Sequence, residues 1–326
     1  MLAQWATRQV VHTLDPTLIT LEERPQRCPR VVIVGPTASG KSALSLAVAR
    51  ERPGTEIVSI DSMQVYRGMD LGTASPSTEE RSAVVHHMVD VLDPTDECTV
   101  GAFQRQALGV LDDLDRRAVP SVLVGGTGLY VKAVVDRLEI PGRFPAVRDD
   151  LDAVSTDELQ RRLHEADPTA AARIDPANRR RLLRALEVTV GSGRPFSSYG
   201  AGIDDYPPAP FPLFGLRVPR PVLDRRIDAR FRAQLDAGLL DEVDALADVP
   251  LSRTAARALG YQELLAHRRG ECSLDEAIDQ AVRRIRRFAR RQERWFRRDP
   301  RIQWIDVTDN PLAALDAVLS DFPSCS

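Results

Sequence analysis

The sequence contains little that would tie the chain to a membrane, a metal cluster or an oxidising compartment. Its 326 residues include only four cysteines, none in a CxxC pair, so neither a zinc site nor a disulfide framework is indicated. No apolar run approaches the roughly 18 residues that span a bilayer, and residues 1–29 lack the apolar segment of a signal peptide. We therefore expect a cytoplasmic protein in a reducing environment, with a monomer as the default.

Lysine is also scarce, whereas arginine is abundant. The only two lysines are Lys41 and Lys132, which suggests that lysine remains where a compact ammonium is needed instead of a planar guanidinium. The net charge of −3 hides an asymmetry, because residues 283–298 carry nine arginines against one acid, Glu293. A basic segment on an otherwise acidic chain favours a polyanionic partner at one face.

A glycine-rich phosphate-binding pattern follows the first apolar run. Residues 31–34 read Val-Val-Ile-Val, and the eight residues after them complete the pattern G-x-x-x-x-G-K-S. A strand, a glycine turn and a helix in this order aim backbone N–H groups and a helix N-terminus at one point, where a diphosphate or triphosphate can bind. Lys41 would reach the outer phosphate oxygens and Ser42 would bind Mg²⁺. The predicted phosphate loop is Gly35, Pro36, Thr37, Ala38, Ser39, Gly40, Lys41 and Ser42.

The first half of the chain alternates strand and helix patterns. We predict strands at 31–34, 57–60, 88–91 and 121–124, and a helix over 103–117. Such alternation is typical of an α/β protein with a parallel sheet and helices on both faces. Ligands of such sheets bind at the carboxyl ends of the strands. The phosphate loop, Asp61 and residues 125–127 should therefore meet in one pocket.

The second half is mostly helical. Residues 143–203 are predicted to form a helical insertion domain, between two parts of the phosphate-loop core at 30–142 and 204–322. A strand at 214–218 belongs to the second part. The last long helix, at about 273–298, carries an apolar stripe of Ile278, Val282, Ile285, Phe288, Ala289 and Trp295. Residues 1–29 are taken as an N-terminal extension that need not be ordered.

Two strand exits offer groups for chemistry. Asp61 ends the run Ile57–Ile60 and could act as a base or hold Mg²⁺ through water; the alternative is an aspartate that caps a helix. The exit at 125–128 reads Gly-Gly-Thr-Gly, where an ATPase of this fold usually has a Mg²⁺-binding acid. A hydroxyl and bare backbone suit hydrogen bonds to a bridging or leaving oxygen; the alternative is a tight turn with a helix cap.

The motifs taken together resemble the tRNA dimethylallyltransferase family. They are, in order, G-P-T-A-S-G-K-S, I-D-S-M-Q-V-Y-R-G-M-D-L-G-T-A, H-H-M-V-D-V-L-D-P, V-G-G-T-G-L-Y, R-R-L-L-R-A-L-E-V and R-A-L-G-Y-Q. The resemblance as a whole runs from about residue 31 to 306. Val85 departs from the pattern, since proline is expected before the His pair. The resemblance implies an enzyme that prenylates the adenosine 3′ of the anticodon in tRNA.

The resemblance also assigns roles to individual residues. The loop would hold the diphosphate of dimethylallyl diphosphate, with Mg²⁺ bound by Ser42. Asp61 would take the proton from the adenine amine, Thr127 would lie near the bridging oxygen, and Arg148 would bind the diphosphate. The family's tRNA-contacting segments match Asp61, Ser62, Met63, Gln64, Arg180, Arg181, Leu182, Leu183, Arg184, Arg257, Ala258, Leu259, Gly260, Tyr261 and Gln262.

Three alternatives remain at this point. An adenylate isopentenyltransferase acting on free AMP, ADP or ATP would share the loop and Asp61, so these cannot separate the two; the helical insertion and the basic helix favour a macromolecular acceptor. A small-molecule kinase is disfavoured by the missing acid after Val124. A non-catalytic RNA-binding module is disfavoured by the intact loop.

Overall fold

The computed structural model describes residues 28–200 and 202–322. Its centre is a six-stranded sheet in which every neighbouring pair is parallel, in the order β3-β2-β4-β1-β5-β6. The strands are β1 Arg30–Val34, β2 Glu56–Ser59, β3 His86–His87, β4 Ser121–Gly125, β5 Leu213–Arg217 and β6 Ile302–Asp306. The predicted α/β class with a parallel sheet is confirmed.

The composition of β1 explains its central position in the sheet. β1 reads RVVIV and is buried at every position, as expected for a strand covered on both faces of a parallel sheet. It pairs with β4 on one side and β5 on the other, so that Val34 lies beside both Gly125 and Gly215. The carboxyl ends of these three strands therefore share one edge.

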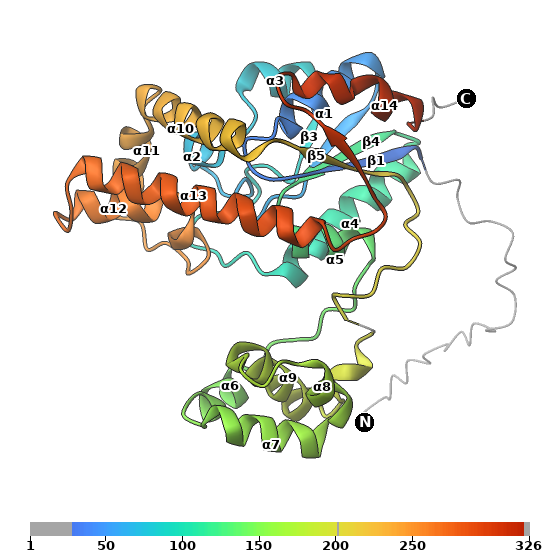
Figure 1. The fold of residues 1–326 in the computed structure, drawn as a ribbon, viewed down its shortest axis with the longest axis vertical. Coiled ribbons are helices and arrows are strands. Elements are labelled where there is room, and N and C mark those ends of the chain that lie inside the picture. The colour runs from blue at the N-terminus through green and yellow to red at the C-terminus, as the bar shows by residue number, and fades with distance from the viewer. Residues whose placement is uncertain (1–27, 201, 323–326) are drawn as a thin grey trace, which may run out of the picture.

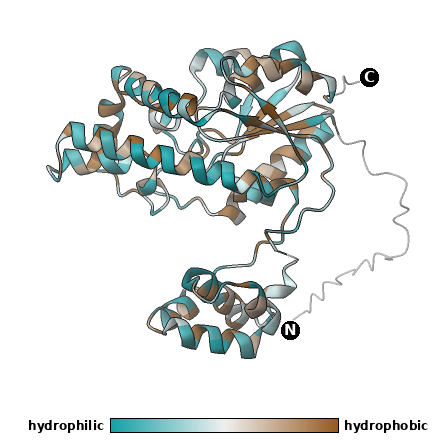
Figure 2. Ribbon diagram, viewed as in Figure 1, coloured by the Kyte–Doolittle hydropathy of each residue, from teal (hydrophilic) through white to brown (hydrophobic). Residues whose placement is uncertain are grey.

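Helices cover both faces of the sheet. In Figure 1, α1 and α14 lie above the sheet, and α4, α5 and the long α13 lie below it. The helices of the core are α1 Lys41–Glu51, α2 Asp70–Thr73, α3 Thr78–Ala83, α4 Val100–Arg116, α5 Gly128–Val135, α10 Arg220–Asp236, α11 Leu239–Leu246, α12 Tyr261–Arg268, α13 Leu274–Phe296 and α14 Leu315–Ser320. Figure 2 shows brown strands at the centre and a largely teal outer side on α13.

Side-chain caps set where several helices begin. Thr99 accepts a hydrogen bond from Ala102 N and starts α4, and Ser273 with Glu276 forms a capping box at the start of α13. The predicted helices at 103–117 and 273–298 are confirmed to within a few residues. The predicted strands at 31–34, 57–60, 121–124 and 214–218 each match to within one residue.

The strand predicted at 88–91 is wrong. The edge strand β3 consists only of His86 and His87. Met88 and Asp90 have φ angles of 63° and 52°, which an extended strand does not allow. The chain turns here because Asp90 pairs with Arg81 and because Val91 donates a backbone hydrogen bond to Val65 O.

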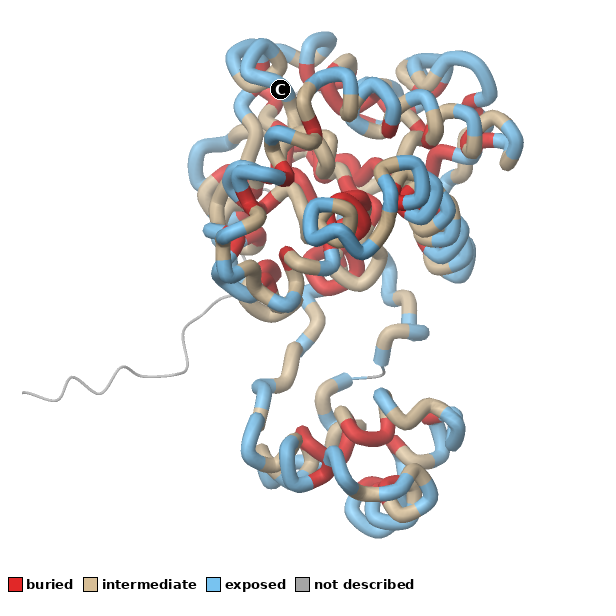
Figure 3. The backbone as a smooth tube through the Cα atoms, turned by 90° about the vertical axis from the view of Figure 1, so that its left-hand side faces the viewer, coloured by how far each residue is buried: buried red, intermediate tan, exposed pale blue. Residues whose placement is uncertain are grey.

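The helical insertion forms a separate unit with its own core. It contains α6 Pro145–Asp152, α7 Thr156–Ala166, α8 Pro168–Arg173 and α9 Arg179–Ser192. Figures 1 and 3 show it apart from the sheet, with buried residues inside it. Its core is Leu151, Leu159, Leu163, Ala170, Ile174, Leu182, Leu183, Ala185 and Leu186. These residues lie within the predicted boundaries 143–203.

The segment that returns from the helical unit is held on the sheet core by two cations, the buried Lys132 and the half-buried Arg301. Lys132 donates hydrogen bonds to Asp136, over 2.6 Å, and to the carbonyl of Asp205. Arg301 donates to Pro207 O over 2.6 Å and to Asp136 over 2.7 Å. Lys132, the chain's second lysine, therefore has a structural role.

The N-terminal extension predicted at 1–29 lies almost wholly outside the described residues.

Candidate active site

The phosphate loop lies between β1 and α1, and its backbone requires glycine at one position. Gly40 has a φ of 96°, in the left-handed region that favours glycine. A Cβ atom there would also lie 2.3 Å from Cβ of Pro311. The C-terminal segment thus packs directly on the turn that precedes α1.

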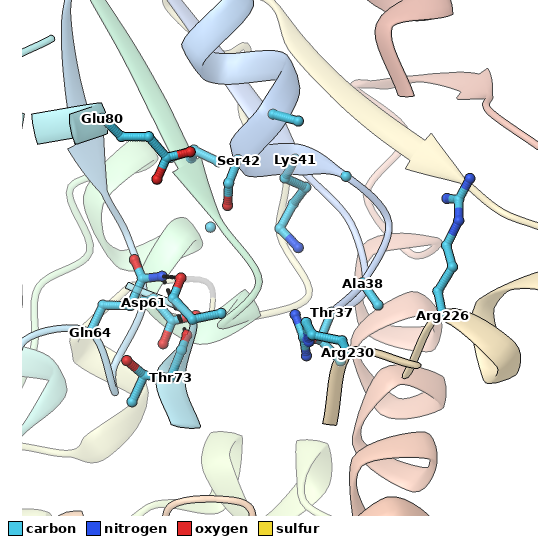
Figure 4. Close-up of a pocket in the computed structure, with 15 residues that line it drawn as sticks. Thr37, Ala38, Lys41, Ser42, Asp61, Gln64, Thr73, Glu80, Arg226 and Arg230 are labelled. Carbon is cyan, nitrogen blue, oxygen red and sulfur yellow. Dashed lines mark hydrogen bonds between the residues drawn. The ribbon is translucent and has the colours of Figure 1, made fainter. Parts of the chain in front are cut away.

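A cavity of about 430 Å³ opens beside this loop. Its walls come from the loop, from the segment after β2, from the end of β4 and from α10 (Figure 4). The lining residues are Thr37, Ala38, Gly40, Lys41, Ser42, Ala43, Asp61, Gln64, Thr73, Ala74, Glu80, Val124, Gly125, Arg226 and Arg230. The predicted meeting of the phosphate loop and Asp61 in one pocket is therefore observed, whereas of residues 125–127 only Gly125 lines the cavity.

Lys41 extends into this cavity from the start of α1. Its Nζ donates a hydrogen bond to Pro36 O over 2.8 Å. Burial lowers the pKa of Lys41 to about 8, although the negative charge of Asp61 opposes the shift and the positive charge of Arg230 adds to it. The free site therefore holds a cation that gains strongly from an anionic ligand.

Asp61 lies on the opposite wall (Figure 4). Its Oδ1 accepts a hydrogen bond from Met63 N over 2.9 Å, which stabilises a turn, whereas the next helix begins only at Asp70. Asp61 is therefore not a helix cap. Thr127 Oγ1 lies 3.4 Å from both Ser62 N and Ser62 Oγ, so this hydroxyl is next to the residue that follows Asp61.

The sequence interpretation missed two arginines of α10. Arg230 Nη2 donates to Thr37 Oγ1 over 2.5 Å, and burial lowers the pKa of Arg230 while the charge of Asp61 opposes that shift. Arg226 lines the same cavity and donates to Thr308 O over 2.9 Å. The two are four residues apart and so share a helix face, which was the available signal.

The residues present fit a diphosphate. Nη1 of Arg226, which lines the cavity, is buried and has no hydrogen-bond partner within 28–200 and 202–322. An unsatisfied cationic donor in a cavity with a lysine and a helix N-terminus suits phosphate oxygens. The hydroxyl of Ser39 also lacks a partner in those ranges, but Ser39 does not line the cavity. Across the same part of the chain, no group of three acidic, His or Cys side chains could hold a metal by itself.

Gln292 of α13 is a third residue that the sequence interpretation missed. Its Oε1 accepts from Thr37 N over 2.9 Å, and its Nε2 donates to Gly126 O over 2.8 Å. A Cβ atom at Gly126 would lie 2.4 Å from this Nε2. Gly126 therefore leaves room for Gln292, whereas the sequence had suggested bare backbone for a ligand oxygen.

Comparisons with known proteins assign the family. A model described as IPP transferase matches residues 64–299, and one described as isopentenyl transferase matches residues 30–89. The tRNA dimethylallyltransferase of Streptomyces coelicolor is 47% identical over 302 residues, which cover 89% of this chain and 96% of that protein. The chain belongs to the tRNA dimethylallyltransferase family. A second relative of that name, from Thermobifida fusca, is 47% identical over 299 residues and covers 87% of this chain and 93% of its own.

Solved structures agree with this assignment. The tRNA isopentenylpyrophosphate transferase from Bacillus halodurans is 35% identical, with a TM-score of 0.65, and the match covers 90% of this chain and 96% of that one. A eukaryotic dimethylallyltransferase shares the fold, with a TM-score of 0.73 at 24% identity.

The described residues contain no helix long and apolar enough to cross a membrane.

Arg148, like Thr127, is a catalytic residue expected from the family that does not line the cavity. It lies on α6 in the helical unit, where its Nε is 3.3 Å from Asp152 and its Nη1 is 3.8 Å from Glu187. Figure 1 shows α6 apart from the sheet. The role of Arg148 at the diphosphate stays a prediction.

The family's tRNA segment on α9 contains residues of two kinds. Arg180 is exposed and Arg181 half-buried, so both are accessible. Leu182 and Leu183 are 0% and 2% exposed in the core of the helical unit, so their side chains are unavailable to RNA and the expectation of direct contact is corrected. Arg184 holds the linker, since it donates to the carbonyls of Pro141 and Gly142 over 2.8 and 2.9 Å.

The segment 257–262 divides in the same way. Arg257 and Gln262 are exposed, Leu259 is half-buried, and Ala258 and Gly260 are buried. Tyr261 is 0% exposed; its hydroxyl donates to Glu242 over 2.5 Å and accepts from Gly72 N over 3.1 Å. A side-chain contact between Tyr261 and tRNA is therefore corrected to a structural role, because its hydroxyl holds Gly72 of α2.

The long helix α13 presents arginines on its outer side. Its buried positions are Ala277, Ala281, Ile285, Ala289, Gln292 and Phe296, so the predicted apolar stripe is partly right and shifted by one position at several places. We call the exposed arginines of this region the basic face: Arg283, Arg287, Arg290, Arg291, Arg294, Arg297 and Arg298.

Proposed function

We propose that this chain transfers a dimethylallyl group from dimethylallyl diphosphate to the exocyclic amine of the adenosine 3′ of the anticodon in tRNA, releasing diphosphate. One observation carries this mechanism: Asp61 and the phosphate loop line opposite walls of the same cavity. That arrangement puts a proton acceptor across from a site for a leaving anion, as alkyl transfer to an amine requires.

The phosphate loop stabilises the leaving diphosphate. Lys41 and Arg230 supply positive charge, and the backbone N–H groups at the start of α1 add hydrogen bonds to the phosphate oxygens. These groups are already in place before the reaction, so little reorganisation accompanies the departure of the anion.

Mg²⁺ fits the same loop. The Ser42 side chain lines the cavity and is the residue that binds Mg²⁺ in loops of this pattern. When bound, the ion supplies further positive charge to the diphosphate oxygens.

Asp61 removes the proton from the amine. Its Oδ1 is held by Met63 N, and no residue of the described ranges donates a hydrogen bond to Oδ2. An aryl amine is a poor acid, so the proton leaves as the new carbon–nitrogen bond forms. Thr127, next to Ser62, would interact with the bridging oxygen, and contact between Arg148 and the diphosphate requires the helical unit to approach the cavity.

The acceptor is a macromolecule. The basic face matches the regularly spaced charges of an RNA backbone, and a free nucleotide would use few of these arginines. Three exposed side chains, those of Arg180, Arg257 and Gln262, would contact the anticodon stem-loop. The half-buried side chains of Ser62, Met63, Gln64 and Arg181 would add contacts. The target base has to leave its stack to reach the cavity, and a loop makes this least costly.

A direct assay tests this proposal. The protein is incubated with radiolabelled dimethylallyl diphosphate and Mg²⁺, once with an anticodon stem-loop and once with AMP. We expect label in the RNA alone. Label on AMP alone would assign the free-nucleotide reaction, and label on neither would reject prenyl transfer.

We expect the reaction to take place in the cytoplasm. Sedimentation of the free protein would test the predicted monomer.

A further inference from the structure

Gln292 is a buried polar residue in the middle of an otherwise apolar helix face. It is 5% exposed, whereas its neighbours Arg291 and Arg294 are exposed. Burying an amide costs free energy unless its hydrogen bonds are made. Here both ends of the amide are used, by Thr37 N over 2.9 Å and by Gly126 O over 2.8 Å.

The two peptide groups that Gln292 joins belong to different strand exits. Thr37 follows β1 and Gly126 follows β4, and the pairing of these strands ends at Val34 and Gly125. Beyond that point no ladder hydrogen bond sets the distance between the two turns. The Gln292 amide spans them instead, and the missing Cβ of Gly126 leaves the space that it occupies.

Thr37 is consequently held from two helices. Its N–H is fixed by Gln292 of α13 and its hydroxyl by Arg230 of α10. Thr37 lines the cavity and lies four residues before Lys41. A shift of Thr37 would therefore move the phosphate loop and Lys41. The diphosphate that they bind would then lie in a different position relative to the turn that contains Thr127.

We propose that Gln292 is a positioning residue that holds the phosphate loop in register with the 125–127 turn, so that the diphosphate and the groups around the bridging oxygen are aligned for transfer. This inference rests on the proposed function. Gln292 touches neither substrate in this arrangement and acts only through Thr37 and Gly126.

A matched pair of variants separates positioning from stability. Gln292→Met keeps the length of the side chain and removes both hydrogen bonds. Gln104→Met is the control, because Gln104 is also buried and its Nε2 donates to Ala133 O and Leu138 O over 2.7 and 2.8 Å, outside the cavity lining. Thermal melts should show similar losses of stability for the two.

Their kinetics should differ. We expect kcat of Gln292→Met to fall by roughly 10- to 100-fold, the range for a small misplacement of reacting groups, with KM for tRNA unchanged. Gln104→Met should stay within about threefold of the unaltered protein, since it leaves the loop where it is. Equal losses in both variants would reduce Gln292 to a structural residue and overturn the inference.

A second substitution adds a pH readout. In Gln292→Glu, the neutral acid can accept from Thr37 N–H and donate to Gly126 O, whereas the carboxylate can only accept and brings a negative charge near the diphosphate. The kcat of Gln292→Glu relative to the unaltered protein should therefore fall as pH rises. The same ratio for Gln292→Met should not depend on pH, and a flat ratio for both would contradict the inference.

Inorganic pyrophosphate distinguishes this inference from the proposed function. Its affinity, measured by calorimetry, should fall about tenfold or more in Gln292→Met and change little in Gln104→Met. If the unaltered protein transfers no prenyl group, the proposed function fails, while the pyrophosphate comparison still tests the register of the loop. If transfer occurs and Gln292→Met behaves normally in both assays, only the inference fails.

Discussion

Arg230 and Thr37 are 193 residues apart in the chain and are joined by a 2.5 Å hydrogen bond from Nη2 to Oγ1. This bond connects α10, which comes after the helical unit, to the phosphate loop, which comes before it. The half-buried arginine shares the cavity with Lys41 and interacts with the charge of Asp61. Arg230 and Lys41 are thereby brought to one anion site.

Loss of the Arg230 charge should weaken the binding of dimethylallyl diphosphate. Charged hydrogen bonds contribute about 1.5–3 kcal/mol, so Arg230→Gln should raise KM for this substrate by roughly 10- to 100-fold, measured at saturating tRNA. Arg232→Gln is the control, because Arg232 is exposed on the same helix. Equal KM values in the two variants would remove Arg230 from the diphosphate site.

Loss of the Asp61 carboxylate should affect turnover more than binding. Asp61→Ala and Asp61→Asn should lower kcat by on the order of 10²–10⁴-fold, the contribution of a general base. The asparagine can still accept from Met63 N, so the turn should be preserved. Filter binding should show tRNA affinity close to that of the unaltered protein, with exposed Asp96→Asn as control. Turnover that stays near normal would exclude Asp61 as the base.

The basic face should account for part of the salt dependence of tRNA binding. Arg287, Arg291 and Arg294 lie at i, i+4 and i+7 on one side of α13 and are exposed. Replacing all three by Gln should weaken tRNA binding and make the slope of log K against log salt shallower by about two to three units, if each neutralises one phosphate.

A control with the same change in net charge tests the location of the effect. Arg50, Arg105 and Arg225 are exposed on α1, α4 and α10, and their replacement by Gln should leave the slope nearly unchanged. An identical slope for the two triple variants would mean that only the overall charge of the protein matters.

Binding of dimethylallyl diphosphate should be coupled to protonation of Lys41. In the free protein burial lowers its pKa to about 8, so at pH 9 most of the molecules carry a neutral lysine. The bound anion favours the charged form, so binding at pH 9 should take up close to one proton and at pH 6.5 almost none. Calorimetry in buffers of different ionisation enthalpy measures this uptake; none at pH 9 would contradict the prediction.

The lowered pKa of Lys41 also predicts how the stability of the ligand-free protein changes with pH. The folded pKa of Lys41, about 8, is lower than its ordinary value of 10.5, so between these pH values the unfolded chain binds more protons than the folded one. The contribution of Lys41 to the free energy of unfolding therefore rises as pH rises through this window. In Lys41→Met this contribution should disappear from the difference in stability between pH 8 and pH 10.

The core of the fold and half of the site could be predicted from local sequence. Apolar runs that end at glycines gave β1 and β4, and the spacing of the loop pattern led to Lys41 and Ser42. Both signals are local, because the same few residues that form the element also display it. The prediction of the edge strand failed because positive φ angles at Met88 and Asp90 leave only two residues to pair with β2. The periodicity of apolar residues contains no information on φ.

Arg230 and Gln292 could not be predicted in this way. Each lies within an arginine-rich helix, and its function depends on a partner far along the chain, Thr37 in both cases. The stripe predicted for this helix contained apolar residues alone, yet Gln292 occupies a buried position of α13. In the sequence, the signal for a buried Gln292 was an amide at a position where the helical periodicity expects an apolar residue.

The order of the strands constrains how the chain matures on the ribosome. β1 emerges early, but one of its two neighbours, β5, is synthesised about 180 residues later, and Arg230, Gln292 and Pro311 come later still. The helical unit draws its core from contiguous residues, so it can fold while the nascent sheet still lacks strands. The pocket that contains the phosphate loop is thus completed only after Arg230, Gln292 and Pro311 have been translated, and ligand cannot stabilise the chain before then.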